Sequence, residues 1–173
     1  MENQNAIIVD IDGTYALGIG EHREAFEYHK CGHDKQNKTV KMVMVAMIRS
    51  HYIDKIIFLS GRENVTFPGK STRKDKSYRR ALWSGKEHKD CYDLTYHWID
   101  HWLSCADIED DQWELFMREA DDNRKDSIIK EEIYNKVIKP RYNIKLVLDD
   151  RNQVVEMWRN IGLPCFQVAP GDF

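Results

Sequence analysis

Short apolar runs alternate along the chain with longer segments whose apolar residues recur at helical spacing. The short runs are typical of buried strands, and the longer segments are typical of amphipathic helices packed on a core. The expected strands cover residues 6–9, 56–59, 113–117, 145–148 and 165–168, and the expected helices cover about 39–48, 91–103, 128–138 and 152–160. This alternation predicts an α/β fold with a mostly parallel sheet and right-handed crossovers.

Several residues at the ends of these segments have the properties of helix boundaries. Thr39 is expected to cap the first helix, and Asp126 or Ser127 is expected to cap the third. With either cap, Lys130 lies in the first turn of its helix, where the helix dipole disfavours a cation unless an anion is close. The position of Lys130 therefore favours a phosphate site. Gly162 follows the last helix and suits a left-handed C-terminal residue.

Two carboxylates follow directly on the first expected strand, at Asp10 and Asp12, with Gly13 and Thr14 after them. In strand geometry the two acids point to the same side. Burying them together is unfavourable unless a cation or a reaction uses them, because desolvation and like charge both oppose ionisation. One acid can attack a phosphorus atom while the other handles the proton of the leaving group. The plain alternative is an acidic loop.

Other polar residues follow the second and fourth expected strands. Ser60 and Arg62 come after the second strand, where a hydroxyl and a guanidinium suit phosphate oxygens. Asp149 and Asp150 come after the fourth strand. The carboxyl ends of parallel strands meet at one edge of a sheet, so we expect these residues to gather there with Asp10.

The side chains expected at this edge are suited to binding a metal ion and a phosphate. Three acids, Asp10, Asp149 and Asp150, form an all-oxygen ligand set whose natural occupant is Mg²⁺. Lys130 and Ser60 would neutralise and orient further phosphate oxygens. This combination predicts phosphoryl transfer rather than glycoside or peptide hydrolysis.

The net charge of the chain indicates that any nucleic-acid binding site must be a local basic patch. The chain of 173 residues has the length of one domain, and its formal net charge of -3 predicts no general affinity for polyanions. One stretch, residues 69–89, differs by its basic side chains, which are Lys70, Arg73, Lys74, Lys76, Arg79, Arg80, Lys86 and Lys89. Tyr78 and Trp83 lie among them, and such a mixture suits a nucleic-acid backbone and its bases. The alternative is a solvated loop.

The sequence also predicts in which compartment the protein is found. No segment has the apolar length of a membrane helix, and the first residues lack the basic and apolar regions of a signal peptide. We therefore expect a cytoplasmic protein without membrane contact, in the host cytoplasm if the protein is viral. The four cysteines are scattered, which suits free thiols in a reducing compartment.

Two groups of residues have partial zinc-site spacing. His29, Cys31 and His33 alternate closely, and His97 and His101 lie one helical turn apart. Neither group has the second pair that a closed zinc site needs. Ordinary surface or packing roles are therefore expected for both.

The order of the chemical residues resembles that of a known superfamily. The motifs Asp10-x-Asp12-Gly13-Thr14, Ser60, Lys130 and Asp149-Asp150 reproduce, in order, the four motifs of the haloacid dehalogenase (HAD) superfamily of phosphatases. Within it, the segments 124–133, 149–159 and 167–173 resemble the 3′-phosphatase domain of the bacteriophage polynucleotide kinase/phosphatase family. The likeness covers nearly the whole chain and weakens between residues 63 and 117.

This resemblance implies a Rossmann-like, three-layer HAD fold with a small cap or insertion. One phosphatase domain would cover residues 1–173, with a basic insertion at about 64–91. The bifunctional members of the family carry an N-terminal kinase domain, and this chain begins almost at the phosphatase strand. No kinase domain is therefore expected here.

The resemblance also implies roles for single residues. Asp10 would be the nucleophile that forms an aspartyl-phosphate, and Asp12 would be first the acid and then the base. Mg²⁺ would be held by Asp10, the Asp12 backbone carbonyl, Asp149 and Asp150, while Ser60 and Lys130 would bind the transferred phosphate. The implied substrate-binding residues are Arg23, Gly61, Arg62, Arg118, Arg124 and Asp126.

Three functions stay open on the sequence. The leading hypothesis is a Mg²⁺-dependent phosphatase that removes 3′-phosphate from DNA or RNA ends, with a separate kinase or ligase as partner. A nucleotide monophosphate phosphatase would use the same acids but needs little basic surface. A non-catalytic nucleic-acid-binding protein would be expected to lack a motif acid, and all of them are present.

Overall fold

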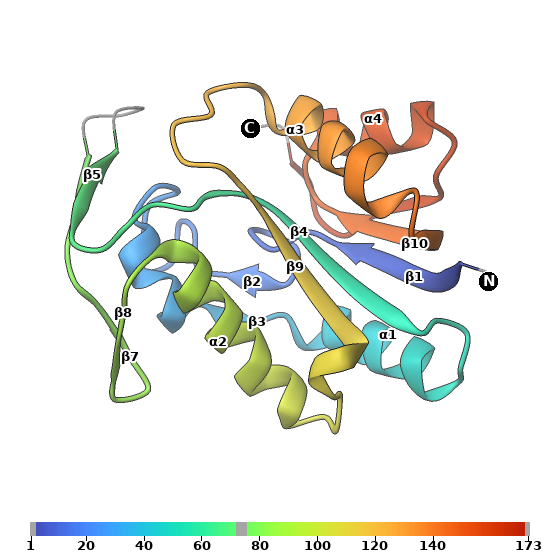
Figure 1. Ribbon diagram of the computed structural model, residues 1–173, viewed down its shortest axis with the longest axis horizontal. Helices are drawn as coiled ribbons and strands as arrows, with labels where there is room; N and C mark the ends of the chain where they lie inside the picture. Colours follow the sequence, from blue (N-terminus) through green and yellow to red (C-terminus); the bar gives the residue numbers. More distant parts are fainter. Residues whose placement is uncertain (1–2, 72–75, 172–173) are drawn as a thin grey trace.

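The computed structural model describes residues 3–71 and 76–171. In this part of the chain a five-stranded parallel sheet has the order β11, β10, β1, β4, β9 (Figure 1). The strands are β1 (Gln4–Val9), β4 (Lys55–Glu63), β9 (Trp113–Arg118), β10 (Tyr142–Asp149) and β11 (Cys165–Gln167). The chain runs outward from β1 to β9 and then returns to β10, on the other side of β1. The strand order therefore reverses beside β1, and open α/β sheets bind ligands at such a point.

Helices cover both faces of this sheet. They are α1 (Lys38–Arg49) and α2 (Cys91–Ser104) on one face, and α3 (Asp126–Ile133) and α4 (Asn152–Asn160) on the other (Figure 1). Ile7 and Val9 pack with Trp98 of α2, whereas Ile8 packs with Trp158 of α4. This alternation gives the predicted three-layer α/β fold. Within the described ranges no helix has the length and apolar character to cross a membrane.

All five strands differ in length from the expectation; β1 begins two residues before its predicted start, and β9 ends one residue after its predicted end. β4 continues through Ser60 and Arg62, which were expected in a turn beyond the strand. The extension is possible because β9 still pairs with this part of β4 across a register shift between Ser60 and Glu63. β10 begins at Tyr142, before the predicted start, and β11 ends at Gln167, one residue before the predicted end.

The start of α1 also corrects an expectation. Asn37 caps this helix, because its side-chain oxygen accepts hydrogen bonds from Thr39 N at 3.1 Å and Val40 N at 3.3 Å. Thr39 is therefore a helical residue and not the cap. Gly162 has the expected left-handed conformation after α4, with a φ of 87°.

The start of α3 differs as well. Neither Asp126 nor Ser127 caps the helix through its side chain, and Lys125 is the residue that precedes its first turn, without a side-chain bond. Lys130 is therefore the fifth residue of α3 and lies beyond the first turn. The helix continues as a π-helical segment, Tyr134–Ile138.

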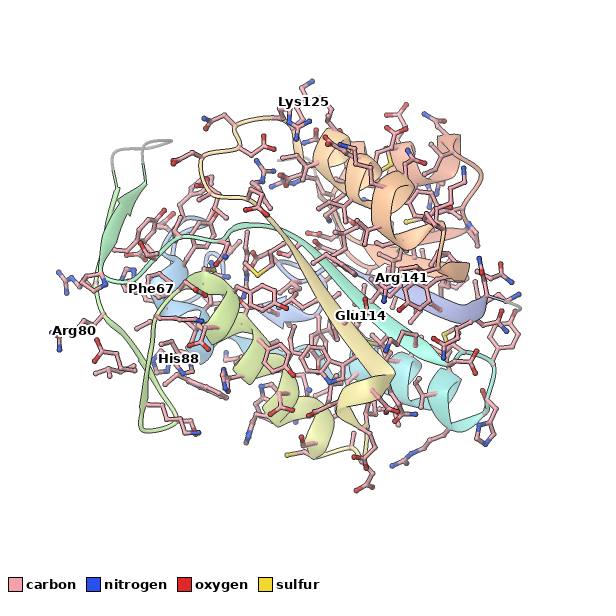
Figure 2. All side chains as sticks on the ribbon, in the orientation of Figure 1. Phe67, Arg80, His88, Glu114, Lys125 and Arg141 are labelled. Atoms are coloured by element: carbon pink, nitrogen blue, oxygen red, sulfur yellow. The ribbon has the colours of Figure 1, made fainter. Side chains whose placement is uncertain are left out.

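The basic stretch, residues 69–89, forms two hairpins in its described part. β5 (Gly69–Ser71) pairs with β6 (Lys76–Tyr78), and β7 (Ala81–Trp83) pairs with β8 (Lys86–His88). Arg73 and Lys74 lie outside the described residues. Tyr78 is buried and stacks on Tyr28, with 6.0 Å between ring centroids. Arg80 lies at the outer edge of the molecule (Figure 2).

Short elements complete the fold between β1 and α1. They are β2 (Ala16–Leu17), the 3-10 helix η1 (Tyr28–His33) and β3 (Lys35–Gln36), and a second 3-10 helix, η2 (Asp110–Gln112), precedes β9. η1 contributes Tyr28 and Cys31 to a small apolar cluster with Phe67 and Tyr78. This cluster joins the basic stretch to the rest of the domain.

A pair of methionines on α1 tests the assignment of the core. Met44 is fully buried against the sheet, whereas Met42 is 64% exposed. We expect Met44→Ala to lower the free energy of unfolding by roughly 2–5 kcal/mol, because the shorter side chain leaves a cavity. Met42→Ala should change it by less than about 0.5 kcal/mol. Urea unfolding followed by circular dichroism measures both, and equal effects would contradict the orientation of α1.

Candidate active site

A pocket opens at the carboxyl edge of the sheet, beside the ends of β1 and β10. It is lined by Asp10, Asp12, Ile19, Ala25, Phe26, Tyr28, Gly61, Arg62, Asp126, Lys130, Asp149, Asp150 and Arg151. Acids, cations and aromatic residues from distant parts of the sequence thus meet in one place. The acids at the ends of the first and fourth predicted strands lie together, as the strand order requires.

A lysine between two carboxylates forms the centre of this pocket. Lys130 Nζ lies 2.6 Å from Asp10 Oδ1 and 2.8 Å from Asp149 Oδ2, and all three side chains are buried. Burial alone would lower the pKa of Lys130, but Asp10 and Asp149 raise it above its usual value. Lys130 is therefore a permanent cation that pairs with two carboxylates, and it does so from beyond the first turn of α3.

The acids at this edge are suited to a divalent cation. One oxygen from each of Asp10, Asp149 and Asp150 lies within 4.8 Å of the others. Burial raises the pKa of Asp10; Lys130 opposes this rise, and the two neighbouring acids add to it. Burial and Asp149 likewise raise the pKa of Asp150. A bound cation would relieve this repulsion, and carboxylate oxygens are the ligands that Mg²⁺ prefers, so the residues fit the predicted ion.

A glycine allows the close approach of two of the acidic segments. Gly13 has a φ of 86°, and a Cβ atom at this position would lie 2.1 Å from Asp150 Oδ2. The hydroxyl of Thr14 donates to Asp150 Oδ1 at 3.4 Å. The residues that follow Asp12 in the motif therefore hold Asp150 in place.

Two arginines hold the second acid of the motif. Arg62 donates to both Asp12 oxygens, at 2.8 and 2.9 Å, and Arg23 Nη2 lies 2.5 Å from Asp12 Oδ1. Arg62 lines the pocket, whereas Arg23 is buried behind it. Burial alone would raise the pKa of Asp12, but Arg62 and Arg23 together lower it well below its usual value. Asp12 is therefore ionised in this arrangement.

Asp34 is a residue of this network that the sequence did not single out. Its carboxylate accepts two hydrogen bonds from Arg23, both at 2.7 Å, and one from Arg62 at 2.8 Å. Its backbone carbonyl accepts from Trp98 Nε1 of α2 at 3.1 Å. Asp34 thus orients both arginines from behind and connects them to the core.

Three more predicted residues lie outside the lining of the pocket. Ser60 is buried, and its hydroxyl accepts the Arg62 backbone N–H at 3.2 Å. Arg118 is fully buried, and its Nη1 donates to two backbone carbonyls of the segment 122–124 at 2.9 Å. Arg124 is half exposed and binds Asp122 and Glu132. Arg118 and Arg124 therefore support the segment before α3 instead of reaching the pocket.

Asp126 closes another side of the pocket. Its carboxylate pairs with Arg118 and Arg151, which explains why it does not cap α3. A Cβ atom on Gly61 would lie 2.9 Å from this carboxylate, so only glycine leaves room for it. Arg151 lines the pocket too, although no role was predicted for it beyond its place after Asp150.

An apolar wall faces these charges. Ile19 and Phe26, from the segment between β2 and η1, and Tyr28, the first residue of η1, line the pocket. No motif marks these residues in the sequence, because their position depends on how this segment folds over β1. The ring of Tyr28 also stacks on Tyr78, so the apolar side of the pocket is in contact with the basic stretch.

The geometry agrees with a comparison with known proteins. Residues 4–173 match the HAD family described as the polynucleotide kinase PNKP phosphatase domain. The chain belongs to this family. The match confirms the predicted resemblance and the HAD-like fold, and it covers all of the pocket residues of this PNKP-type domain.

Individual relatives agree with this assignment. A protein of Autographa californica nuclear polyhedrosis virus, provisionally named a bifunctional polynucleotide kinase/RNA ligase, is 28% identical over 159 residues, which are 92% of this chain and 18% of the viral protein. A solved Pnkp1/Rnl/Hen1 RNA repair complex contains a chain with a TM-score of 0.73 and 33% identity. A second Pnkp1/Rnl/Hen1 complex gives 0.67 and 32%. Each of these two structural matches covers 99% of the PNKP-type domain. They cover 44% and 48% of the matched chains, so the PNKP-type domain spans less than half the length of each of the three relatives.

The buried acid behind the arginines gives a stability test. Asp34→Asn removes a charge that compensates Arg23 and Arg62, and breaking a buried ion pair from one side costs roughly 3–5 kcal/mol. We expect a decrease of this size in the free energy of unfolding in urea. Glu21→Gln, which removes an exposed carboxylate paired with Lys35, should leave the unfolding midpoint unchanged. An Asp34→Asn protein as stable as the parent would show that Asp34 does not carry the network.

Proposed function

We propose that this domain is a Mg²⁺-dependent phosphatase that removes 3′-phosphate from nucleic-acid ends through an aspartyl-phosphate intermediate. The observation that carries the proposal is the buried cluster at the end of β1 and β10, where Lys130 lies between Asp10 and Asp149. Membership of the PNKP phosphatase-domain family supports the same chemistry. A carboxylate, a lysine and a cation site together are suited to phosphoryl transfer.

Asp10 is the nucleophile in this proposal. Its carboxylate forms a bond to phosphorus while the bond from phosphorus to the 3′-oxygen breaks, and water later attacks the aspartyl-phosphate to release inorganic phosphate. Lys130 neutralises the charge that gathers on Asp10 and on the phosphate oxygens. Asp10, Asp149, Asp150 and the Asp12 backbone carbonyl would hold Mg²⁺, which supplies positive charge for the phosphate when it is bound.

Asp12 serves as the acid and base, and the arginines control when it can act. It protonates the leaving 3′-oxygen and then takes the proton of the attacking water. In the free site Arg62 and Arg23 keep it ionised. A substrate phosphate in the pocket competes with Asp12 for Arg62, since both are anions that bind arginine through paired hydrogen bonds. Substrate binding therefore raises the pKa of Asp12 toward the range that an acid needs.

Four observations support a polynucleotide as the substrate. Phe26 is partly exposed and offers aromatic surface beside the phosphate site, and base stacking on such a side chain is tolerant of sequence. Tyr78 stacks on Tyr28, and Arg79 and Arg80 follow it on exposed positions. One relative is a chain of an RNA repair complex, and another is named as a polynucleotide kinase/RNA ligase. These names favour RNA ends as the substrate and a kinase or ligase as the partner.

A comparison of two substrates tests this function. We expect faster phosphate release from a 3′-phosphorylated oligonucleotide than from the matching 3′-mononucleotide, in the presence of Mg²⁺ and at low salt. RNA and DNA oligonucleotides are measured side by side. Asp10→Asn should lower the rate by roughly 10³-fold or more, because it removes the nucleophile.

Each other outcome has a clear meaning. Absence of phosphate release from every substrate would overturn the proposal. Equal or faster turnover of the mononucleotide would assign the domain to nucleotide metabolism with the same chemistry. Activity that survives in Asp10→Asn would show that another residue is the nucleophile.

The exposed arginines after Tyr78 give a separate prediction. The double variant Arg79→Ala/Arg80→Ala should slow the reaction with the oligonucleotide and leave the mononucleotide rate unchanged. The dependence of kcat/KM on salt should also weaken, by about 0.7 in the logarithmic slope for each interaction with a phosphate that the variant removes. Arg49→Ala/Lys139→Ala removes the same charge near the amino ends of β4 and β10 and should leave both rates unchanged. Equal slowing by the two double variants would contradict a specific role of the basic stretch.

A further inference from the structure

A second group of potential metal ligands lies away from the active-site pocket, between the hairpin β7–β8 and α2. It consists of His88, the last residue of β8, and of Asp93 and His97 on α2. One nitrogen of each imidazole and one oxygen of the carboxylate lie within 4.8 Å of one another. None of the three lines the phosphate pocket. His88 is beside α2 in Figure 2.

The separations within this group suit a small tetrahedral ion. His88 Nδ1 lies 3.0 Å from Asp93 Oδ2, and His97 Nδ1 lies 3.4 Å from Asp93 Oδ1. Ligands about 2.0–2.1 Å from a tetrahedral zinc ion are separated by about 3.4 Å. The first separation is shorter than this value and the second matches it, and each involves a different oxygen of Asp93.

One imidazole of the group is almost fully buried. His88 is 2% exposed, and the ring nitrogen that faces Asp93 is Nδ1. An ion beside Asp93 would therefore bind Nδ1 and not Nε2, which lies on the other side of the ring. His88 also lines, with His97, a surface pocket through which an ion can reach the group.

Hydrogen bonds within the group are the structural alternative to a bound ion. Asp93 is the third residue of α2, and its Oδ2 accepts the Lys89 backbone N–H at 3.3 Å, as acids near helix starts often do. His97 Nδ1 lies 2.8 Å from the Asp93 carbonyl one turn earlier, and His88 Nδ1 lies 3.0 Å from Asp93 Oδ2. An ion would take the place of these bonds, and a metal titration separates the two cases.

We propose that His88, Asp93 and His97 form a binding site for a transition-metal ion of the zinc type. Two imidazoles and one carboxylate are ligands that zinc prefers, and solvent would complete the tetrahedron. The site is separate from the acidic Mg²⁺ cluster, whose ligands are all oxygens. It brings together a histidine that sequence spacing had noted, His97, and two partners that it had not.

The ion would join the basic stretch to the domain. An isolated two-stranded hairpin is at best marginally stable, and β7 and β8 have three residues each. A metal ion shared between β8 and α2 would fix the hairpin at the point where its second strand meets the helix. Small elements with little core commonly use such a link.

His101 provides a matched control. It lies one turn after His97 on α2 and lines the same surface pocket, but it is not a member of the three-residue group. Its ring instead contacts Trp83 and Trp102. A variant of His101 therefore removes a more exposed imidazole from the same pocket without removing a proposed ligand.

The test is a titration of the purified chain without a histidine tag. The protein is treated with a chelator, returned to excess Mg²⁺ and titrated with Zn²⁺ by calorimetry and with Co²⁺ by visible absorption. We expect one ion per chain, a Co²⁺ spectrum of the four-coordinate type, and a higher Tm with Zn²⁺. His97→Gln should weaken binding by about tenfold or more and abolish the rise in Tm, whereas His101→Gln should leave both unchanged.

The remaining outcomes would overturn the proposal. They are absence of binding, binding that His97→Gln does not weaken, and equal weakening in His97→Gln and His101→Gln. Asp149→Asn, which removes a ligand of the acidic cluster, should still bind one Zn²⁺. Absence of Zn²⁺ binding in Asp149→Asn alone would place the ion at the acidic cluster. The His97 side chain is 41% exposed, so its variant is expected to fold, and circular dichroism checks this.

Discussion

The repulsion among three buried carboxylates dominates this structure. Asp10, Asp149 and Asp150 lie at the ends of two neighbouring strands, where neither solvent nor distance separates their charges. Lys130 lies beside two of them, Asp10 and Asp149, and its single positive charge does not balance the three acids. The remaining negative charge favours a divalent cation. The sheet order, with β10 beside β1, and the packing of α3 are what hold the acids and the lysine within reach of one another.

A second layer of charge controls the other acid of the motif. Arg23 and Arg62 bind Asp12 on the side of the pocket and Asp34 on the buried side. Asp34 keeps the two guanidinium groups in place whether or not Asp12 holds them. In the proposed reaction Arg62 would exchange Asp12 for a substrate phosphate while its bond to Asp34 holds it in place, which would connect phosphate binding to proton transfer.

The basic stretch is connected to the chemistry through aromatic packing. Tyr78 of β6 stacks on Tyr28, and Tyr28 lines the phosphate pocket. A strand bound along Arg79 and Arg80 would thus lead toward the reacting phosphate. On the other side of the stretch, the group of His88, Asp93 and His97 lies where the second hairpin meets α2. The proposed substrate contact would then lie between the two hairpins, and the proposed metal site would lie at the end of the second hairpin.

The fold class, the family and the acids at the ends of the strands could all be predicted from the amino-acid sequence. Each of these follows from a local pattern, such as an apolar run that ends in Asp10 or in Asp149. Only the three-dimensional structure showed that Asp34 binds the two arginines and that Arg124 lies outside the pocket. It also showed that His88 lies close to His97. These contacts join residues that no local pattern links, because they depend on how separate segments pack against one another. For the same reason Asp126 bonds to Arg118 and Arg151 across the pocket instead of capping its own helix.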